Sequence, residues 1–261
     1  MSNKILEFYN KWYEEHKKHK PTSNDDNTQY KGRIRIPKNH YICGMICDEV
    51  YKEPNLRRKK IELFELDQRF NTPRTVVYKI SLIFDDVFII GIRGTNVNSI
   101  VDLASDALVL IGQEKLSIRK YEQTKYVENI VNTLQNEGYR LNQSYLTGHS
   151  LGALVCAYIM MVIPEINGVG FNTGTSPLQV AQITRTIPNI FTPILNGVAN
   201  TSRFVNYHMK GDILSVSSTY IFLDTITLKP FPEPSSTFQA HRMSYILQET
   251  QPNPDFNFNF N

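Results

Sequence analysis

Short apolar runs alternate with helix-like segments through the middle of the chain. Runs of β-branched and aromatic residues at 76–80 and 87–92 predict a hairpin, and its second strand is apolar enough to be buried on both faces. Apolar residues recur at the spacing of one helical face within residues 99–111 and again within residues 121–134. The pattern therefore predicts two strands followed by two amphipathic helices.

The same alternation continues toward the C-terminus. Residues 143–147 predict a short strand that leads into a glycine, and the apolar residues 151–163 predict a buried helix directly after it. Further strands are predicted at 169–172 and 203–208, and a helix is predicted earlier in the chain at 41–51. Because strands and helices alternate, we expect an α/β fold with a mostly parallel central sheet flanked by helices.

The two ends of the chain differ from this middle. Residues 1–40 are polar and are interpreted as an N-terminal extension, whereas residues 251–261 are rich in Asn and Phe and predict a flexible tail. Residues 41–250 are expected to form one domain, which includes a hairpin at 61–66 where apolar and acidic residues alternate.

Composition and charge change this picture little. Apolar residues make up 41% and charged residues 20% of the chain, as in ordinary globular proteins, and a net charge of +3 is too small to indicate nucleic-acid binding. The spacing of Cys43, Cys47 and Cys156 fits neither a disulfide framework nor a zinc site, so we expect reduced thiols and no metal or cofactor. Without a signal peptide or transmembrane segment in the pattern, a cytoplasmic location is expected.

The turn between the strand at 143–147 and the buried helix carries a Gly-x-Ser-x-Gly motif. Its residues are Gly148, His149, Ser150, Leu151 and Gly152. A glycine on each side of so sharp a turn relieves crowding, and the serine hydroxyl then lies at the carboxyl edge of the sheet beside a helix N-terminus. This context predicts the nucleophile elbow of a serine hydrolase.

A serine nucleophile needs a base that a carboxylate orients. At this kind of elbow the chain order is serine, acid, histidine, and only two of the six histidines, His208 and His241, follow Ser150. Asp212 lies just after a predicted strand, so we predict Asp212 as the acid and His241 as the base, with Asp224 as the alternative acid. The acidic residues between the serine and His241 are Glu165, Asp212, Asp224 and Glu233.

Acyl transfer also needs two N–H donors directed at the oxyanion. The backbone N–H of Leu151, directly after the nucleophile, is the first candidate. Thr95, which follows Arg93 and Gly94 at the end of the strand at 87–92, is the second, and its hydroxyl is able to add a further donor. Together with the elbow, these residues predict a site for ester or amide cleavage.

These segments resemble the class 3 (fungal-type) lipases of the α/β-hydrolase superfamily. The matching segments are residues 92–95 (Ile-Arg-Gly-Thr), 148–153 (Gly-His-Ser-Leu-Gly-Ala), 168–177, 207–214 and 241–245. The resemblance implies the α/β-hydrolase fold. It assigns the functional roles to Thr95, Ser150, Leu151, Asp212 and His241.

The resemblance also implies a substrate class. Lipid esters, either acylglycerols or phospholipids, are expected to be cleaved through an acyl-enzyme. Residues 96–111 are expected to form either a lid that contacts a membrane surface transiently or a fixed packing helix. A phospholipase A1 or a non-lipolytic carboxylesterase is one alternative. An inactive lipase-like binding or structural module is another, since the family's His-x-Gly-Phe motif is replaced by Ser-Ile-Arg-Lys-Tyr at residues 117–121.

Overall fold

The computed structural model describes residues 33–81, 86–94, 113–174, 203–212, 225–230 and 233–253. These residues form two β-sheets and the helices that accompany them. The strands are β1 (Ile34–Ile36), β2 (Lys60–Ile61), β3 (Phe64–Leu66), β4 (Thr75–Ser81), β5 (Asp86–Ile92), β6 (Tyr145–His149), β7 (Asn167–Phe171), β8 (Phe204–Met209), β9 (Thr225–Leu228) and β10 (Thr250–Pro252). The helices are α2 (Lys38–Glu49), α4 (Gln113–Asn136), α5 (Leu151–Val162), α8 (Thr237–His241) and α9 (Met243–Glu249), with short 3₁₀ turns at Pro54–Leu56, Gln68–Phe70 and Leu141–Gln143.

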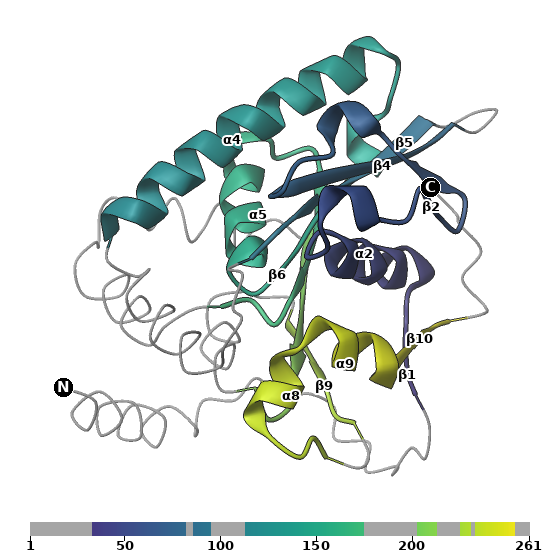
Figure 1. The fold of residues 1–261 in the computed structure, drawn as a ribbon, viewed down its shortest axis with the longest axis vertical. Coiled ribbons are helices and arrows are strands. Elements are labelled where there is room, and N and C mark those ends of the chain that lie inside the picture. The colour runs from purple at the N-terminus through teal and green to yellow at the C-terminus, as the bar shows by residue number, and fades with distance from the viewer. Residues whose placement is uncertain are drawn as a thin grey trace.

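The central sheet contains eight of these strands in the order β2-β3-β4-β5-β6-β7-β8-β9. Neighbours from β2 to β5 are antiparallel, whereas every neighbouring pair from β5 to β9 is parallel. Helices α4 and α5 lie on one face of the sheet, and α2 and α9 lie on the other (Figure 1). The predicted α/β architecture with a mostly parallel central sheet is confirmed.

The alternation of side chains along β4 and β5 produces a core on each face. Val76 and Tyr78 belong to the core under α2 and α9, and Val77 between them belongs to the core under α4 and α5. On β5, Ile89 faces the first core and Ile90 faces the second, and both are fully buried. The predicted hairpin is therefore confirmed, including the burial of its second strand on both faces.

Helix α4 ends where the sequence predicts but begins earlier. Gly138 has φ of 97°, and the N–H of Tyr139 donates to the carbonyl of Leu134 at 3.0 Å, which closes the helix in the left-handed conformation that glycine adopts easily. The helix starts at Gln113 rather than at residue 121. Residues 113–120 are mostly good helix formers with few apolar positions, so periodicity alone did not extend the helix over them.

A second, two-stranded sheet joins distant parts of the chain. β1 and β10 pair in parallel, with Ile34 opposite Thr250 and Ile36 opposite Pro252. The paired strands extend beyond both predicted limits of the domain, residues 41 and 250. The described parts contain no helix long and apolar enough to cross a membrane.

Gly91 sets how closely α2 approaches β5. A Cβ at this position would lie 2.8 Å from the Cγ2 atoms of Ile46 and Val76, and both of these branched side chains are fully buried. Gly91→Val should therefore lower the free energy of unfolding by about 2 kcal/mol through overpacking. Urea unfolding followed by circular dichroism measures the change. An unaltered midpoint would contradict the prediction, because it would show that α2 moves away from β5 without loss of stability.

Candidate active site

The Gly-x-Ser-x-Gly motif forms a tight turn between β6 and α5. Ser150 has φ of 56° and ψ of −127°, a backbone conformation that residues other than glycine rarely adopt. Its N–H donates to the carbonyl of Phe171 on β7 at 3.0 Å, which fixes the turn to the neighbouring strand. Strand, turn and helix thus follow in the predicted order, and the serine carries the backbone strain that is typical of functional turns.

The two flanking glycines are needed because the backbone is crowded on both sides of the serine. A Cβ at Gly148 would meet the backbone of Gly152 and Ala153, and a Cβ at Gly152 would meet the carbonyl of Ile92 at the end of β5. These obstacles are backbone atoms, which cannot move aside as a flexible side chain would. The turn therefore excludes any larger residue at either position.

Three predicted site residues meet at the carboxyl edge of the sheet. Ser150 follows β6, Asp212 follows β8, and His241 is the last residue of α8. The Nε2 atom of His241 lies 3.0 Å from the Oγ of Ser150, and its Nδ1 atom lies 2.8 Å from the Oδ2 of Asp212. The exposed fractions of Ser150, Asp212 and His241 are 8%, 1% and 5%. The hydrogen bonds therefore form in an environment with little competing water.

This arrangement can move a proton. With Nδ1–H donated to the carboxylate of Asp212, the lone pair on Nε2 of His241 is directed at the hydroxyl of Ser150. A neutral imidazole in this tautomer is able to accept the hydroxyl proton, and the carboxylate stabilises the imidazolium that results. The three groups have the geometry of a nucleophile, a base and an orienting acid.

The other candidates for acid and base are not part of this hydrogen-bonded set of three side chains, or they lie outside the described residues. His208 is buried within β8. Glu233 pairs with Lys210 on the surface, and Asp224 falls in a segment that the structure does not describe. Thr95 and the predicted lid at 96–111 also lie outside the described residues.

The described part of the predicted oxyanion site lies at the N-terminus of α5. As the first residue of that helix, Leu151 has an N–H without an intrahelical acceptor. A Cβ at Gly174 would lie 3.3 Å from the Oγ of Ser150 and 3.4 Å from the nitrogen of Leu151. The missing side chain at Gly174 therefore leaves room for an atom that contacts both groups.

His149 and Tyr51 support the turn from the other side. The Nε2 atom of His149 lies 2.6 Å from the carbonyl oxygen of His241, and because a carbonyl only accepts, Nε2 must carry the proton. The Nδ1 atom is then an acceptor, and the hydroxyl of Tyr51 donates to it at 3.1 Å. The same hydroxyl accepts the N–H of Gly94 at 3.2 Å, so Tyr51 joins the end of β5 to the turn.

The sequence predicts no role for Tyr51. It is the last residue of the predicted helix at 41–51, and no motif includes it. Its partner His149 lies 98 residues away in the sequence. A hydrogen bond at that separation leaves no periodic signal in a single chain.

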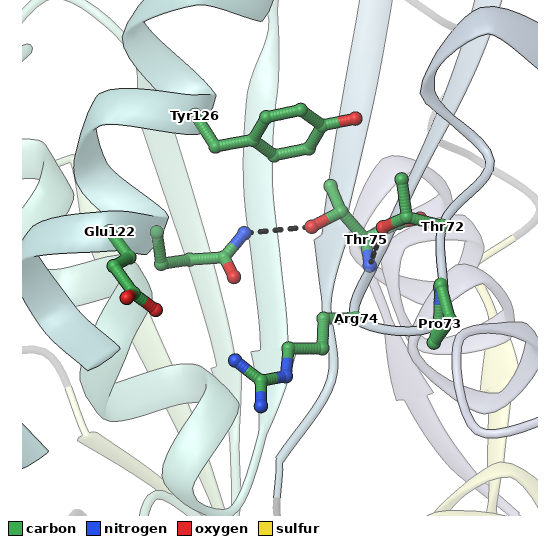
Figure 2. Close-up of a pocket in the computed structure, with 7 residues that line it drawn as sticks. Thr72, Pro73, Arg74, Thr75, Glu122 and Tyr126 are labelled. Atoms are coloured by element: carbon green, nitrogen blue, oxygen red, sulfur yellow. Dashed lines mark hydrogen bonds between the residues drawn. The ribbon is translucent and has the colours of Figure 1, made fainter. Parts of the chain in front are cut away.

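A separate cavity of about 330 Å³ lies near the same edge of the sheet, between the start of β4 and α4. Figure 2 shows Glu122 and Tyr126 of α4 facing Arg74 and Thr75, and the amide of Gln123 donates to the hydroxyl of Thr75 at 2.7 Å. None of Ser150, Asp212 and His241 lines this cavity. It is therefore distinct from the candidate active site.

Neither a metal site among the described residues nor a match to a known protein assigns a further role to the candidate site. In the parts of the chain that are described, no group of three His, Cys, Asp or Glu side chains could hold a metal ion. Comparisons with models of protein families, with characterised proteins and with solved structures find no match for this chain. The resemblance to class 3 lipases therefore stays a prediction, and the interpretation of the site depends on its geometry.

His149 should remain neutral throughout the range in which ordinary histidines titrate. Burial, followed by the nearby His241, lowers the pKa of His149 to about 3, against about 6.5 for a solvated imidazole. We expect ¹⁵N NMR between about pH 5 and about pH 8 to show one unchanging tautomer with the proton on Nε2. Tyr51→Phe serves as the control, because it removes the donor to Nδ1. A proton on Nδ1, or titration near pH 6, would contradict the assignment.

Proposed function

We propose that this chain is a serine hydrolase with the α/β-hydrolase fold that cleaves carboxylic esters. The observation that carries the proposal is the pair of hydrogen bonds through which His241 joins Ser150 and Asp212, at 3.0 and 2.8 Å. The three residues occur in the chain order serine, acid, histidine that is typical of this fold, and the serine lies on a strained turn between a strand and a helix. Both features support the proposal independently of any relative.

In the proposed reaction, His241 takes the proton from the hydroxyl of Ser150 as Oγ attacks the ester carbonyl. The tetrahedral intermediate places its negative charge beside the N–H of Leu151, and the sequence assigns the second donor to Thr95. Asp212 stabilises the imidazolium of His241, which then protonates the departing alcohol oxygen as the bond from carbon to that oxygen breaks. Water repeats the sequence on the acyl-enzyme and releases the acid, and Ser150 regains its proton.

The proposed substrates are esters of lipids, as the resemblance to class 3 lipases implies. The space beside Gly174 is in accord with an acyl substrate, because it borders both the hydroxyl of Ser150 and the nitrogen of Leu151. Comparing short-chain nitrophenyl esters with emulsified acylglycerols and with phospholipid vesicles separates a lipase from a carboxylesterase and from a phospholipase A1. A lipase should prefer the emulsified acylglycerol.

The nucleophile is tested by covalent labelling. A fluorophosphonate probe should label the wild-type protein and leave Ser150→Ala unlabelled, because phosphonylation needs the activated hydroxyl. Hydrolysis of a nitrophenyl ester should fall at least about 10³-fold in the same variant. Mass spectrometry locates the adduct, and equal labelling of the two proteins would contradict the role of Ser150. A wild-type protein that neither reacts nor hydrolyses would favour the inactive module.

Gly174→Ala should block the site without disturbing the fold. The added methyl would stand within 3.4 Å of both the nucleophile and the Leu151 nitrogen, in the volume that the substrate carbonyl must enter. We expect kcat/KM for a nitrophenyl ester to fall about 100-fold, comparable to the loss of one oxyanion donor. Gly44→Ala is the matched control, since its Cβ would make contacts of 3.2–3.3 Å with core side chains instead. Equal activity of the two variants would show that the carbonyl binds elsewhere.

A further inference from the structure

The backbone at the end of α8 is held by side chains at the ends of two different strands. In a helix of only five residues, Thr237–His241, the last carbonyl groups have no acceptor role within the helix, and so short a helix is marginal without outside support. The carbonyls of Ala240 and His241 are consecutive, and each accepts a hydrogen bond from a buried side chain outside α8. The peptide that carries the proposed base is therefore fixed from outside its own helix.

The first support comes from the end of β6. His149 donates from Nε2 to the carbonyl of His241 at 2.6 Å, and Tyr51 holds the other ring nitrogen of His149 at 3.1 Å. The rings of His149 and His241 lie side by side, with centroids 4.8 Å apart. Because burial keeps the pKa of His149 low, the ring stays neutral and its Nε2–H continues to point at the carbonyl.

The second support comes from Asn172, the residue directly after β7. Its Nδ2 donates to the carbonyl of Ala240 at 2.8 Å, and its Oδ1 accepts the N–H of Met209, the last residue of β8, at 2.8 Å. Asn172 is fully buried and has φ of 44°, a left-handed conformation in which asparagine is one of the more frequent residues. One amide thus connects the segment that bears His241 to the strand that leads to Asp212.

We infer that His149 and Asn172 are positioning residues that hold the peptide groups of residues 240 and 241 so that the imidazole of His241 reaches Ser150 and Asp212 together. The consequence for catalysis rests on the proposed function. Among the described residues neither side chain forms a hydrogen bond with the hydroxyl of Ser150, and both act through the backbone of the base. A displacement of about 1 Å in a catalytic group lowers rates by about 100-fold, so the two hydrogen bonds are expected to matter for turnover.

The variants that test this inference remove one donor at a time. Asn172→Gly deletes the amide and tolerates the positive φ, and His149→Leu deletes both ring nitrogens. His149→Gln retains an N–H donor near the position of Nε2 and should restore part of the loss. Asn167→Gly is the matched control, because Asn167 begins β7 and its Nδ2 donates to the carbonyls of Asn142 and Ser144 at 2.8 and 3.1 Å. His40→Gln is the control for His149, since His40 is a histidine bound to the hydroxyl of Tyr207 at 2.7 Å.

Two measurements are made on each variant. The first is kcat and KM for a nitrophenyl ester. We expect Asn172→Gly and His149→Leu to lower kcat about 10- to 100-fold with little change in KM, and both controls to keep the wild-type kcat. The second is the low-field proton resonance of the hydrogen bond between His241 and Asp212, recorded without substrate. We expect this resonance in the wild type and in both controls, and its loss in Asn172→Gly and His149→Leu.

The two measurements separate the inference from the proposed function. If the wild-type protein hydrolyses no ester, the proposed function fails, and loss of the proton resonance in Asn172→Gly would still support the positioning role. If the resonance and kcat are both unchanged in Asn172→Gly and His149→Leu, the positioning role is overturned while the hydrolase remains. Equal losses of kcat in Asn167→Gly and Asn172→Gly would also overturn it, because they would indicate general destabilisation. A variant that does not fold is replaced by Asn172→Asp or His149→Phe, each of which also lacks the donor and to which the same criteria apply.

Discussion

The described site depends on the close approach of backbone at the two ends of one turn. Gly148 and Gly152 have no side chains, so β6, the start of α5 and the end of β5 lie in direct backbone contact. In this turn Ser150 has a positive φ of 56°, and the N–H of Leu151 follows directly at the start of α5. Backbone strain of this kind costs of order 1–3 kcal/mol, which the surrounding packing must offset.

Three adjacent parallel strands supply the remaining parts. β6, β7 and β8 are neighbours, so their carboxyl ends meet at one edge, where ligands of α/β sheets commonly bind. Ser150 follows the first of these strands, Asn172 the second, and Asp212 the third. Helix α8 then brings His241 to the same edge from a later part of the chain (Figure 1). The parallel order of the strands thus converts distant sequence positions into one constellation.

The sequence predicted those parts that leave a local pattern. Ser150 lies in a motif between a strand and an apolar helix, and chain order selected Asp212 and His241 from few candidates. The supports of the base could not be predicted, because His149 and Asn172 donate to backbone carbonyls 92 and 68 residues away, and every residue type offers such a carbonyl. Short elements such as β1, β9, α8 and β10 escaped prediction for a related reason, since a few residues show no periodicity.

The burial of imidazoles in this fold has a consequence for its proton balance. Burial lowers the pKa of His40 to about 4 and that of His149 to about 3, and it also lowers the pKa of His208. In the unfolded chain the same side chains take up protons near pH 6.5. Between roughly pH 6.5 and pH 4 the unfolded state therefore binds more protons than the folded state, so acidification draws the equilibrium toward unfolding. Mild acid is therefore expected to lower the free energy of unfolding through groups of which two, His40 and His208, lie outside the proposed catalytic machinery.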